Sequence, residues 1–210
     1  MRKLILFTLL LVFALSTSVF AQGIKAGIRG GVNLSKVVNQ DLTIKPDYKK
    51  GFSGGFFASF GLGPLAFQPE ALFTMKGAQL KEELLSVVNN VNINMNYLEI
   101  PILAKVSIPL TRSISLNLFG GPSVAIKLSA KAVSEIAGKS VDENIKDIKS
   151  TDFGLAFGGG IKFGALTIEG RYTPGLTSIG KSQTGIFQSI NSGTKNSVIT
   201  LTAEYLFYGM

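Results

Sequence analysis

The sequence predicts an all-β fold: an eight-stranded antiparallel up-and-down transmembrane β-barrel, preceded by a cleavable signal peptide. Three observations lead to this prediction: segments in which apolar and polar residues alternate, connections that alternate between long and short, and an apolar leader. Alternation with a period of two marks a strand whose two faces meet different surroundings. A strand that crosses a bilayer at a tilt needs about nine to eleven residues, whereas ordinary strands have about five or six.

The N-terminal leader has the parts of a secretory signal peptide. Two basic residues follow the initial Met, residues 4–15 are almost continuously apolar, and Ala21 precedes the expected cleavage point. Such a leader is removed from the mature protein. A single transmembrane anchor is the alternative, but polar residues at 16–18 interrupt the apolar run and no basic cluster follows it. We therefore expect a signal peptide at 1–21 and one barrel domain at 22–210.

The clearest strand pair comprises residues 96–108 and 114–128, joined by a tight turn. On the first strand the apolar face consists of Leu98, Ile100, Ile102, Ala104, Val106 and Ile108. The other face consists of Tyr97, Glu99, Pro101, Leu103, Lys105 and Ser107. On the second strand small and polar residues alternate in the same way with Ile114, Leu116, Leu118, Val124, Ile126 and Leu128.

Six further segments repeat this pattern and complete the set of eight expected strands. In chain order they are 23–34, 51–62, 65–79, 152–163, 166–176 and 198–207. The last is the most regular, with Ile199, Leu201, Ala203, Tyr205 and Phe207 on one face and Val198, Thr200, Thr202, Glu204 and Leu206 on the other. A run of three glycines at 158–160 blurs the alternation, and glycine within strands is typical of bulges and close packing.

The connections alternate in length. Short turns are expected at 61–64, 108–112 and 162–165, and long polar loops at 35–50, 79–94, 129–151 and 177–196, the second with a candidate helical turn at 81–85. Bacterial outer-membrane barrels have short periplasmic turns and longer external loops, and their even strand number places both termini in the periplasm. A soluble carrier barrel of the lipocalin type is the alternative, but it would bury its apolar face and have shorter strands.

The residue inventory excludes most site chemistry. The 210 residues include no His, Cys or Trp, so a Ser-His-Asp triad, a Cys-His pair and a histidine-bound zinc are excluded. We expect no catalytic residue, metal ligand or cofactor, and no enzyme activity. Without the two basic leader residues, 19 basic residues face 13 acidic ones, a net charge of +6. These charges are dispersed, which argues against nucleic acid and favours contact with membrane lipid and lipopolysaccharide.

Charged residues also occur on the strand faces opposite the apolar belt. They are Arg29, Glu70, Glu99, Lys105, Glu169, Arg171 and Glu204. An eight-stranded barrel is just wide enough for side chains to fill it, and an unpaired buried charge is costly. We therefore expect a structural ion network inside the barrel. A narrow ion path or proton-linked gate is one alternative, and a catalytic carboxylate pair is another, although nothing in the sequence fixes its spacing. The sequence identifies no ligand-binding residue.

Aromatic residues near the strand ends are typical of the girdle at a membrane interface. The candidates are Tyr97, Tyr172, Tyr205, Phe207 and Tyr208. The last strand, with Tyr205 and Phe207, also resembles the C-terminal signal read by the barrel-assembly machinery, which is therefore an expected partner during biogenesis.

The segments QPEALFTMKGA at 68–78 and YLEIPILAKV at 97–106 are similar to the PorT-like outer-membrane β-barrel family. The resemblance extends over essentially the whole mature chain, through segments such as GIKAGIRGGVNLS, FGLAFGGGIKFG and SVITLTAEYLF. It implies a barrel in the bacterial outer membrane and a link to the type IX secretion machinery, in which the family's namesake takes part. Three functions remain open: a structural or loop-mediated binding role in the cell envelope, an accessory subunit of such a machinery, and a narrow small-solute pore.

Overall fold

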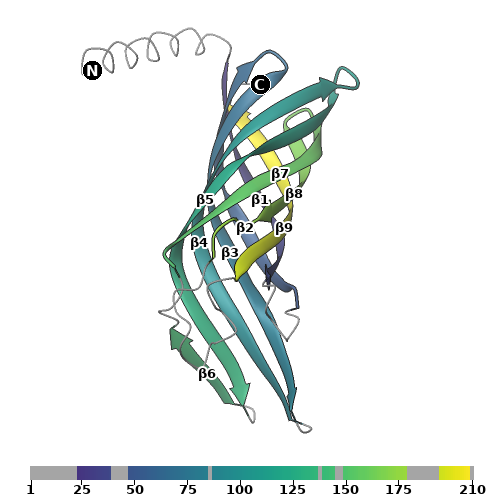
Figure 1. The fold of residues 1–210 in the computed structure, drawn as a ribbon. Helices are drawn as coiled ribbons and strands as arrows, with labels where there is room; N and C mark the ends of the chain where they lie inside the picture. The colour runs from purple at the N-terminus through teal and green to yellow at the C-terminus, as the bar shows by residue number, and fades with distance from the viewer. Residues whose placement is uncertain are drawn as a thin grey trace, which may run out of the picture.

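The computed structural model is a closed β-barrel whose strands tilt steeply around a common axis (Figure 1). The structure describes residues 23–38, 47–84, 87–136, 139–144, 149–178 and 194–208, so the expected signal peptide lies outside the described residues. The strands are β1 (Ile24–Val38), β2 (Lys49–Leu62), β3 (Leu65–Leu84), β4 (Val87–Pro109), β5 (Ile114–Ile136), β6 (Lys139–Asn144), β7 (Thr151–Phe163), β8 (Leu166–Pro174) and β9 (Lys195–Tyr208). No helix within the described ranges is long and apolar enough to cross a membrane.

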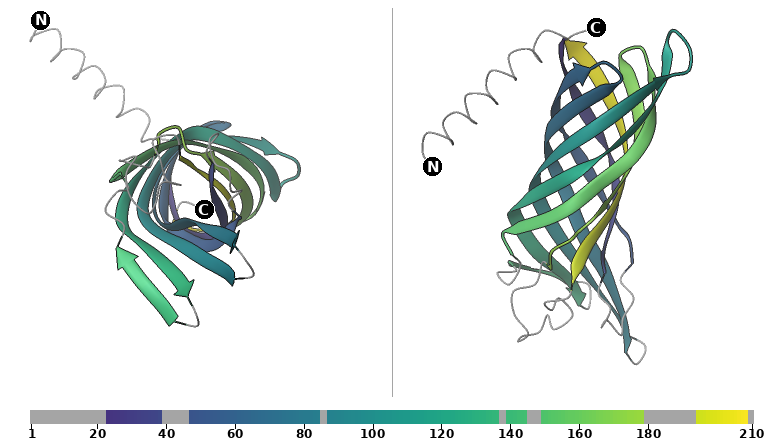
Figure 2. Two further views of the ribbon diagram at one scale, coloured as in Figure 1. Left: turned by 60° about the horizontal axis from the view of Figure 1, so that its bottom comes forward. Right: turned by 45° about the horizontal axis from the view of Figure 1, so that its top comes forward.

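Eight of these strands form the ring, each antiparallel to the next along the chain. β1 pairs with β9 to close the ring, β4 pairs with β5, and β5 continues to β7. β6 pairs with the far end of β5 and stands outside the ring (Figure 2). The predicted eight-stranded antiparallel barrel is therefore confirmed.

The three short turns lie at one end of the barrel, together with the start of β1 and the end of β9. Gly63 and Gly164 occupy two of these turns with positive φ angles of 68° and 59°. This left-handed conformation is open to glycine without steric cost and explains how such short connections reverse the chain. In the third turn, the amide N–H of Leu110 donates to the carbonyl oxygen of Ile114 at 2.9 Å.

The alternation along the strands separates a lipid-facing surface from the lumen. On β4, Ile102 is 39 % exposed whereas its neighbour Leu103 is completely buried. On β9, Leu201 is 57 % exposed whereas Thr202 is buried. The predicted faces of both strands are thus correct. Apolar side chains on the outer surface are not covered by other parts of the barrel, as expected for strands whose outer face contacts lipid and not water.

Two predicted loops are wrong, because the strands continue through them. β3 and β4 extend the pairing as far as Leu84 and Val87, so 79–84 and 87–94 are paired strands, and 81–84 do not form the predicted helical turn. β5 reaches Ile136 and β6 pairs with it, which converts much of 129–151 into a second hairpin. Polar composition suggested loops, but β-branched residues such as Val87, Val88 and Val91 favour the extended chain.

Tyr97 is a further correction, because the prediction that it belongs to an aromatic girdle fails. Its side chain is completely buried inside the barrel, on the same face as Glu99. Tyr172, Tyr205 and Phe207 are exposed on the outer surface, and the side chain of Tyr208 lies outside the described set.

The close approach of strands explains part of the glycine content. A Cβ added to Gly158 would collide with the carbonyl oxygen of Gly170 on β8 and would lie 2.8 Å from the ring of Phe119. A Cβ on Gly121 would likewise collide with the carbonyl oxygen of Ile102. The glycines therefore leave room for neighbouring backbone and for the large side chains that point into the lumen.

The outward face of β9 can be tested by placing a charge on it. Replacing Leu201 by Arg should destabilise the folded barrel by about 2–4 kcal/mol, because the guanidinium would be forced into hydrocarbon. Urea unfolding in lipid vesicles, followed by the gel shift between heated and unheated protein, measures this loss. The exposed turn variant Thr111→Arg is the control and should behave as the unmodified protein; a neutral result for Leu201→Arg would reverse the assigned faces.

Candidate functional site

The middle of the lumen is occupied by six charged side chains that converge from five strands. Arg29 comes from β1, Glu70 from β3, Lys105 from β4, Glu169 and Arg171 from β8, and Glu204 from β9; each is at most 5 % exposed. These six residues are called the central cluster. Each follows from the inward phase of its strand, since it lies between two outward-facing neighbours.

Arg29 joins three strands. Its Nη1 lies 2.6 Å from Glu70 Oε1 and 3.0 Å from Glu204 Oε1, and its Nη2 donates to the hydroxyl of Thr202 at 2.7 Å. Glu70 and Glu204 are separated from Arg29 by 41 and 175 residues in the sequence. Arg29 therefore connects β1 to β3 on one side of the ring and to β9 on the other.

Arg171 binds Glu70 through two hydrogen bonds. Nη1 donates to Oε2 at 2.8 Å and Nη2 donates to Oε1 at 2.9 Å. This fork-to-carboxylate geometry is among the strongest charge-assisted arrangements in proteins. The amide of Gln68 adds a third donor to Glu70, at 2.9 Å, and also reaches Glu204 at 3.2 Å. Glu70 is thus held by β1, β3 and β8 together.

Lys105 completes the central cluster. Its Nζ lies 2.6 Å from Glu169 Oε1 and 3.1 Å from Glu204 Oε2. The ring of Phe119 packs beneath the cluster, with Lys105 Nζ at 5.4 Å and Arg171 at 5.2 Å from its centroid. Three cations and three carboxylates make the cluster electrically neutral, which lowers the cost of holding these charges away from water.

Glu99, the seventh residue predicted for the network, lies in a separate group. Its Oε2 is 3.1 Å from Lys76 Nζ, and the hydroxyl of Ser123 donates to its Oε1 at 2.8 Å. Lys76 is also 4.0 Å from Asp152 Oδ2, which accepts a hydrogen bond from the Asn196 amide at 2.7 Å. Lys76, Glu99 and Asp152 are called the outer cluster.

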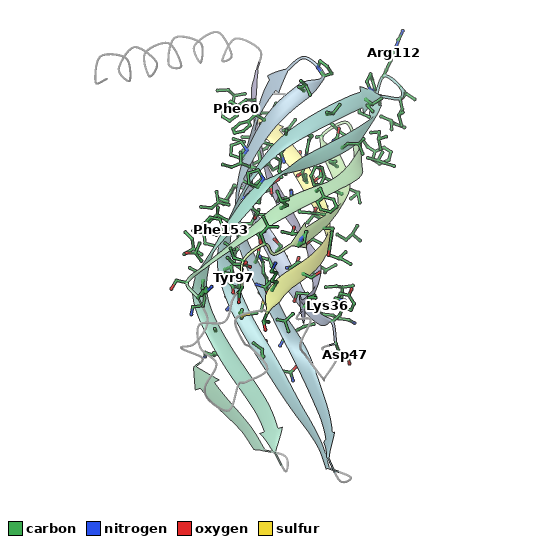
Figure 3. All side chains as sticks on the ribbon, in the orientation of Figure 1. Lys36, Asp47, Phe60, Tyr97, Arg112 and Phe153 are labelled. Carbon is green, nitrogen blue, oxygen red and sulfur yellow. The ribbon has the colours of Figure 1, made fainter. Side chains whose placement is uncertain are left out.

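The outer cluster lies toward the end of the barrel opposite the short turns. Lys76 Nζ is 5.2 Å from the ring centroid of Tyr97, and Figure 3 shows Tyr97 far from Arg112 in the β4–β5 turn. Lys76 and Asp152 were missed as site residues, although both stand at inward positions of their strands. The inward phase alone could have identified them.

The two clusters leave little room in this part of the lumen. A cavity of about 10 Å³ lies beside Arg29, Thr74 and Glu99, and another of about 10 Å³ lies beside Lys76 and Asp152. Each has the volume needed for roughly one water molecule. Among the described residues, no group of three acidic side chains is placed to hold a metal ion. The geometry of both clusters is therefore that of closely paired charges.

The pairing of Arg171 with Glu70 can be tested by removing one partner and then both. Arg171→Met should lower the free energy of unfolding by about 3–5 kcal/mol, because it leaves the buried cluster with an excess carboxylate. The double variant Arg171→Met with Glu70→Gln restores neutrality and should recover part of that loss. Urea unfolding of detergent-folded protein measures both. The exposed Arg112→Met variant is the control, and equal stability of Arg171→Met and this control would contradict a coupled buried pair.

Two solved structures of bacterial proteins match most of this chain. The structure of Ail, the attachment invasion locus protein of Yersinia pestis, in complex with the heparin analogue sucrose octasulfate is 15 % identical in sequence. The match covers 88 % of this chain and 99 % of that chain, with a TM-score of 0.44. Neisserial surface protein A is 13 % identical over 88 % of this chain and 99 % of its own, with a TM-score of 0.48.

The sequence also matches a protein-family model over most of its length. The search of curated proteins gave no match. The family model for the outer membrane protein beta-barrel domain matches residues 20–180, which include the strands β1 to β8 and both charged clusters apart from Glu204 on β9. The closed antiparallel ring, with its apolar outer surface and charged lumen, agrees with that match. The chain belongs to the outer membrane protein beta-barrel domain family, whose place is the bacterial outer membrane.

Proposed function

We propose that this protein is a non-enzymatic outer-membrane barrel that binds a partner at the cell surface through strands that project beyond the membrane. The observation that carries the proposal is a four-stranded extension of the barrel wall. It consists of 79–84 of β3, 87–92 of β4, 131–136 of β5 and β6, and is called the projecting sheet. Figure 1 shows these strands continuing well past the ring, at the end opposite the short turns.

A change in the outward face of β4 supports a boundary between lipid and water. From Leu98 to Ile108 the outward residues are apolar, but at Asn92, Asn94 and Asn96 they are amides. In the same part of β4 the inward residues are apolar, because Ile93 and Met95 are both buried. Amides are unsuited to hydrocarbon, so the chain before Leu98 lies outside the lipid belt.

The projecting sheet offers free strand edges as a binding surface. Among the described residues, β6 pairs only with β5, and 79–84 of β3 pair only with β4. The edge of a sheet carries unpaired N–H and C=O groups that can pair with an added strand of a partner.

The other functions predicted from the sequence have less support. A pore requires an open lumen, whereas the two clusters fill the middle of this one. A catalytic function has less support because the 210 residues contain neither His nor Cys. The resemblance to PorT-like proteins favours an accessory role in a type IX-like secretion machinery, which would use the same protein as a docking partner. Outer-membrane lipid, lipopolysaccharide and the barrel-assembly machinery are the partners that the barrel itself would meet, after removal of the leader at 1–21.

Photo-crosslinking in native cells tests where partners bind. A probe at Ser140 in β6 should give specific crosslinks to an envelope or extracellular partner, whereas a probe at Thr111 in the β4–β5 turn is the matched control at the opposite end. Crosslinks to secretion subunits from either site would favour the accessory role. Absence of specific crosslinks from Ser140, whatever the Thr111 probe gives, would contradict a binding function for the projecting sheet.

Planar-bilayer recording tests the closed lumen. The purified barrel should show no steady conductance, because paired charges from five strands obstruct the path. An open porin in the same bilayer provides the positive control. Stable, reproducible current steps from the monomer would overturn the closed-lumen claim.

A further inference from the structure

The short-turn end of the lumen contains a cavity of about 280 Å³ that is distinct from the two small cavities beside the charged clusters. Every strand of the ring contributes to its lining, from Lys25 on β1 and Ser59 on β2 to Thr167 on β8 and Glu204 on β9. The cavity is therefore coaxial with the barrel. Because short turns face the periplasm in bacterial barrels, it is called the periplasmic vestibule.

The floor of the periplasmic vestibule is closed by the central cluster. Gln68, Lys105 and Glu204 all line the cavity and are themselves buried. Lys105 is neutralised there by Glu169 at 2.6 Å and Glu204 at 3.1 Å. The vestibule is thus a blind pocket, and its floor contributes no net charge.

The walls, in contrast, carry two further lysines. Lys25 comes from β1 and Lys162 from β7, and both are half-buried with their side chains on the lumen side of the strand. Within the described part of the chain, neither has a carboxylate at ion-pair distance. Among the described residues, Glu204 is the single acidic residue in the lining. The vestibule therefore has an excess positive charge of two, directed at a shared space.

Neutral hydrogen-bond donors surround these lysines. Ser59, Ser115 and Thr167 present hydroxyl groups to the cavity. Ser107 donates to the side-chain oxygen of Asn117 at 2.8 Å, which leaves the Asn117 amide nitrogen as a donor. Lysines combined with hydroxyl and amide donors suit an anion with several acceptor oxygens. A lysine ammonium acts as a point charge and, unlike an arginine, does not prefer the two parallel hydrogen bonds that a planar carboxylate accepts.

We propose that the periplasmic vestibule binds a phosphate-bearing anion, with Lys25 and Lys162 as its charged contacts. The cavity is just below the range of pockets that hold small organic ligands, so a compact group such as pyrophosphate or the head of a phosphorylated metabolite fits it. A phospholipid headgroup from the inner leaflet presents the same chemistry. A bound anion also relieves the repulsion between two lysines that face one low-dielectric space.

The test uses the mature full chain, folded in a maltoside detergent that contains no phosphate. Isothermal titration with pyrophosphate at low salt should show saturable binding to one site. The double variant Lys25→Gln with Lys162→Gln should bind at least about tenfold more weakly, because it removes both charged contacts. Addition of salt should weaken binding by the unmodified protein.

A matched control separates the site from overall charge. The double variant Arg112→Gln with Lys149→Gln removes the same two charges from exposed positions outside the vestibule and should bind as the unmodified protein does. The gel shift between heated and unheated samples establishes that each variant is folded. Absence of saturable binding by the unmodified protein, or equal weakening in both double variants, would overturn the proposal.

Competition identifies the source of the phosphate. Displacement of pyrophosphate by micelles that contain phosphatidylglycerol would assign the vestibule to a lipid headgroup. Retention of pyrophosphate in their presence would assign it to a soluble phosphate compound. Either result supports recognition of phosphate, and neither depends on the projecting sheet, so this test can fail or succeed independently of the proposed surface function.

Discussion

The rest of the structure depends on the mutual neutralisation of charges in the lumen. Arg29, Glu70 and Arg171 come from β1, β3 and β8, none of which pairs with another. They are nevertheless in direct contact because the ring is closed and narrow. A buried charge without its partner costs several kcal/mol, so a shift of one strand by a single residue would turn these side chains into lipid and leave their partners unpaired. The cluster thereby fixes strand register and ring closure together.

This constraint also determines where the protein can interact with other molecules. Side chains fill the middle of the barrel, and the apolar outer surface is committed to lipid. What remains are the two ends, and these differ in construction. At one end the wall extends into the projecting sheet (Figures 1 and 2), whose outer edges pair with no further strand among the described residues. At the other end, the periplasmic vestibule lies beside the short turns. Binding at one end requires no change in the other, since the central cluster stands between them.

Much of this architecture could be predicted from the sequence, because a period of two assigns every residue of a strand to one of two faces. The outward position of Ile102 and the inward position of Lys105 both follow from it. The separation of the two clusters also follows from the sequence. Glu99 and Lys105 are six residues apart on β4, a distance of about 20 Å along the strand, so they belong to different clusters. Which residue meets Arg171 across the barrel could not be predicted, because that depends on strand stagger. The hairpin made by 79–84 and 87–94 was not predicted, because its asparagines are typical of loops.

The charges along the barrel axis form a gradient that follows from these positions. The outer cluster has one cation and two carboxylates, the central cluster is neutral, and the walls of the vestibule add Lys25 and Lys162. An anion that enters the lumen from the short turns would meet positive charge in a partly enclosed, low-dielectric space where attraction is strongest, whereas the outer cluster has an excess carboxylate. The inward-facing side chains that close the lumen therefore also leave an excess of positive charge in the periplasmic vestibule, where we propose that an anion binds.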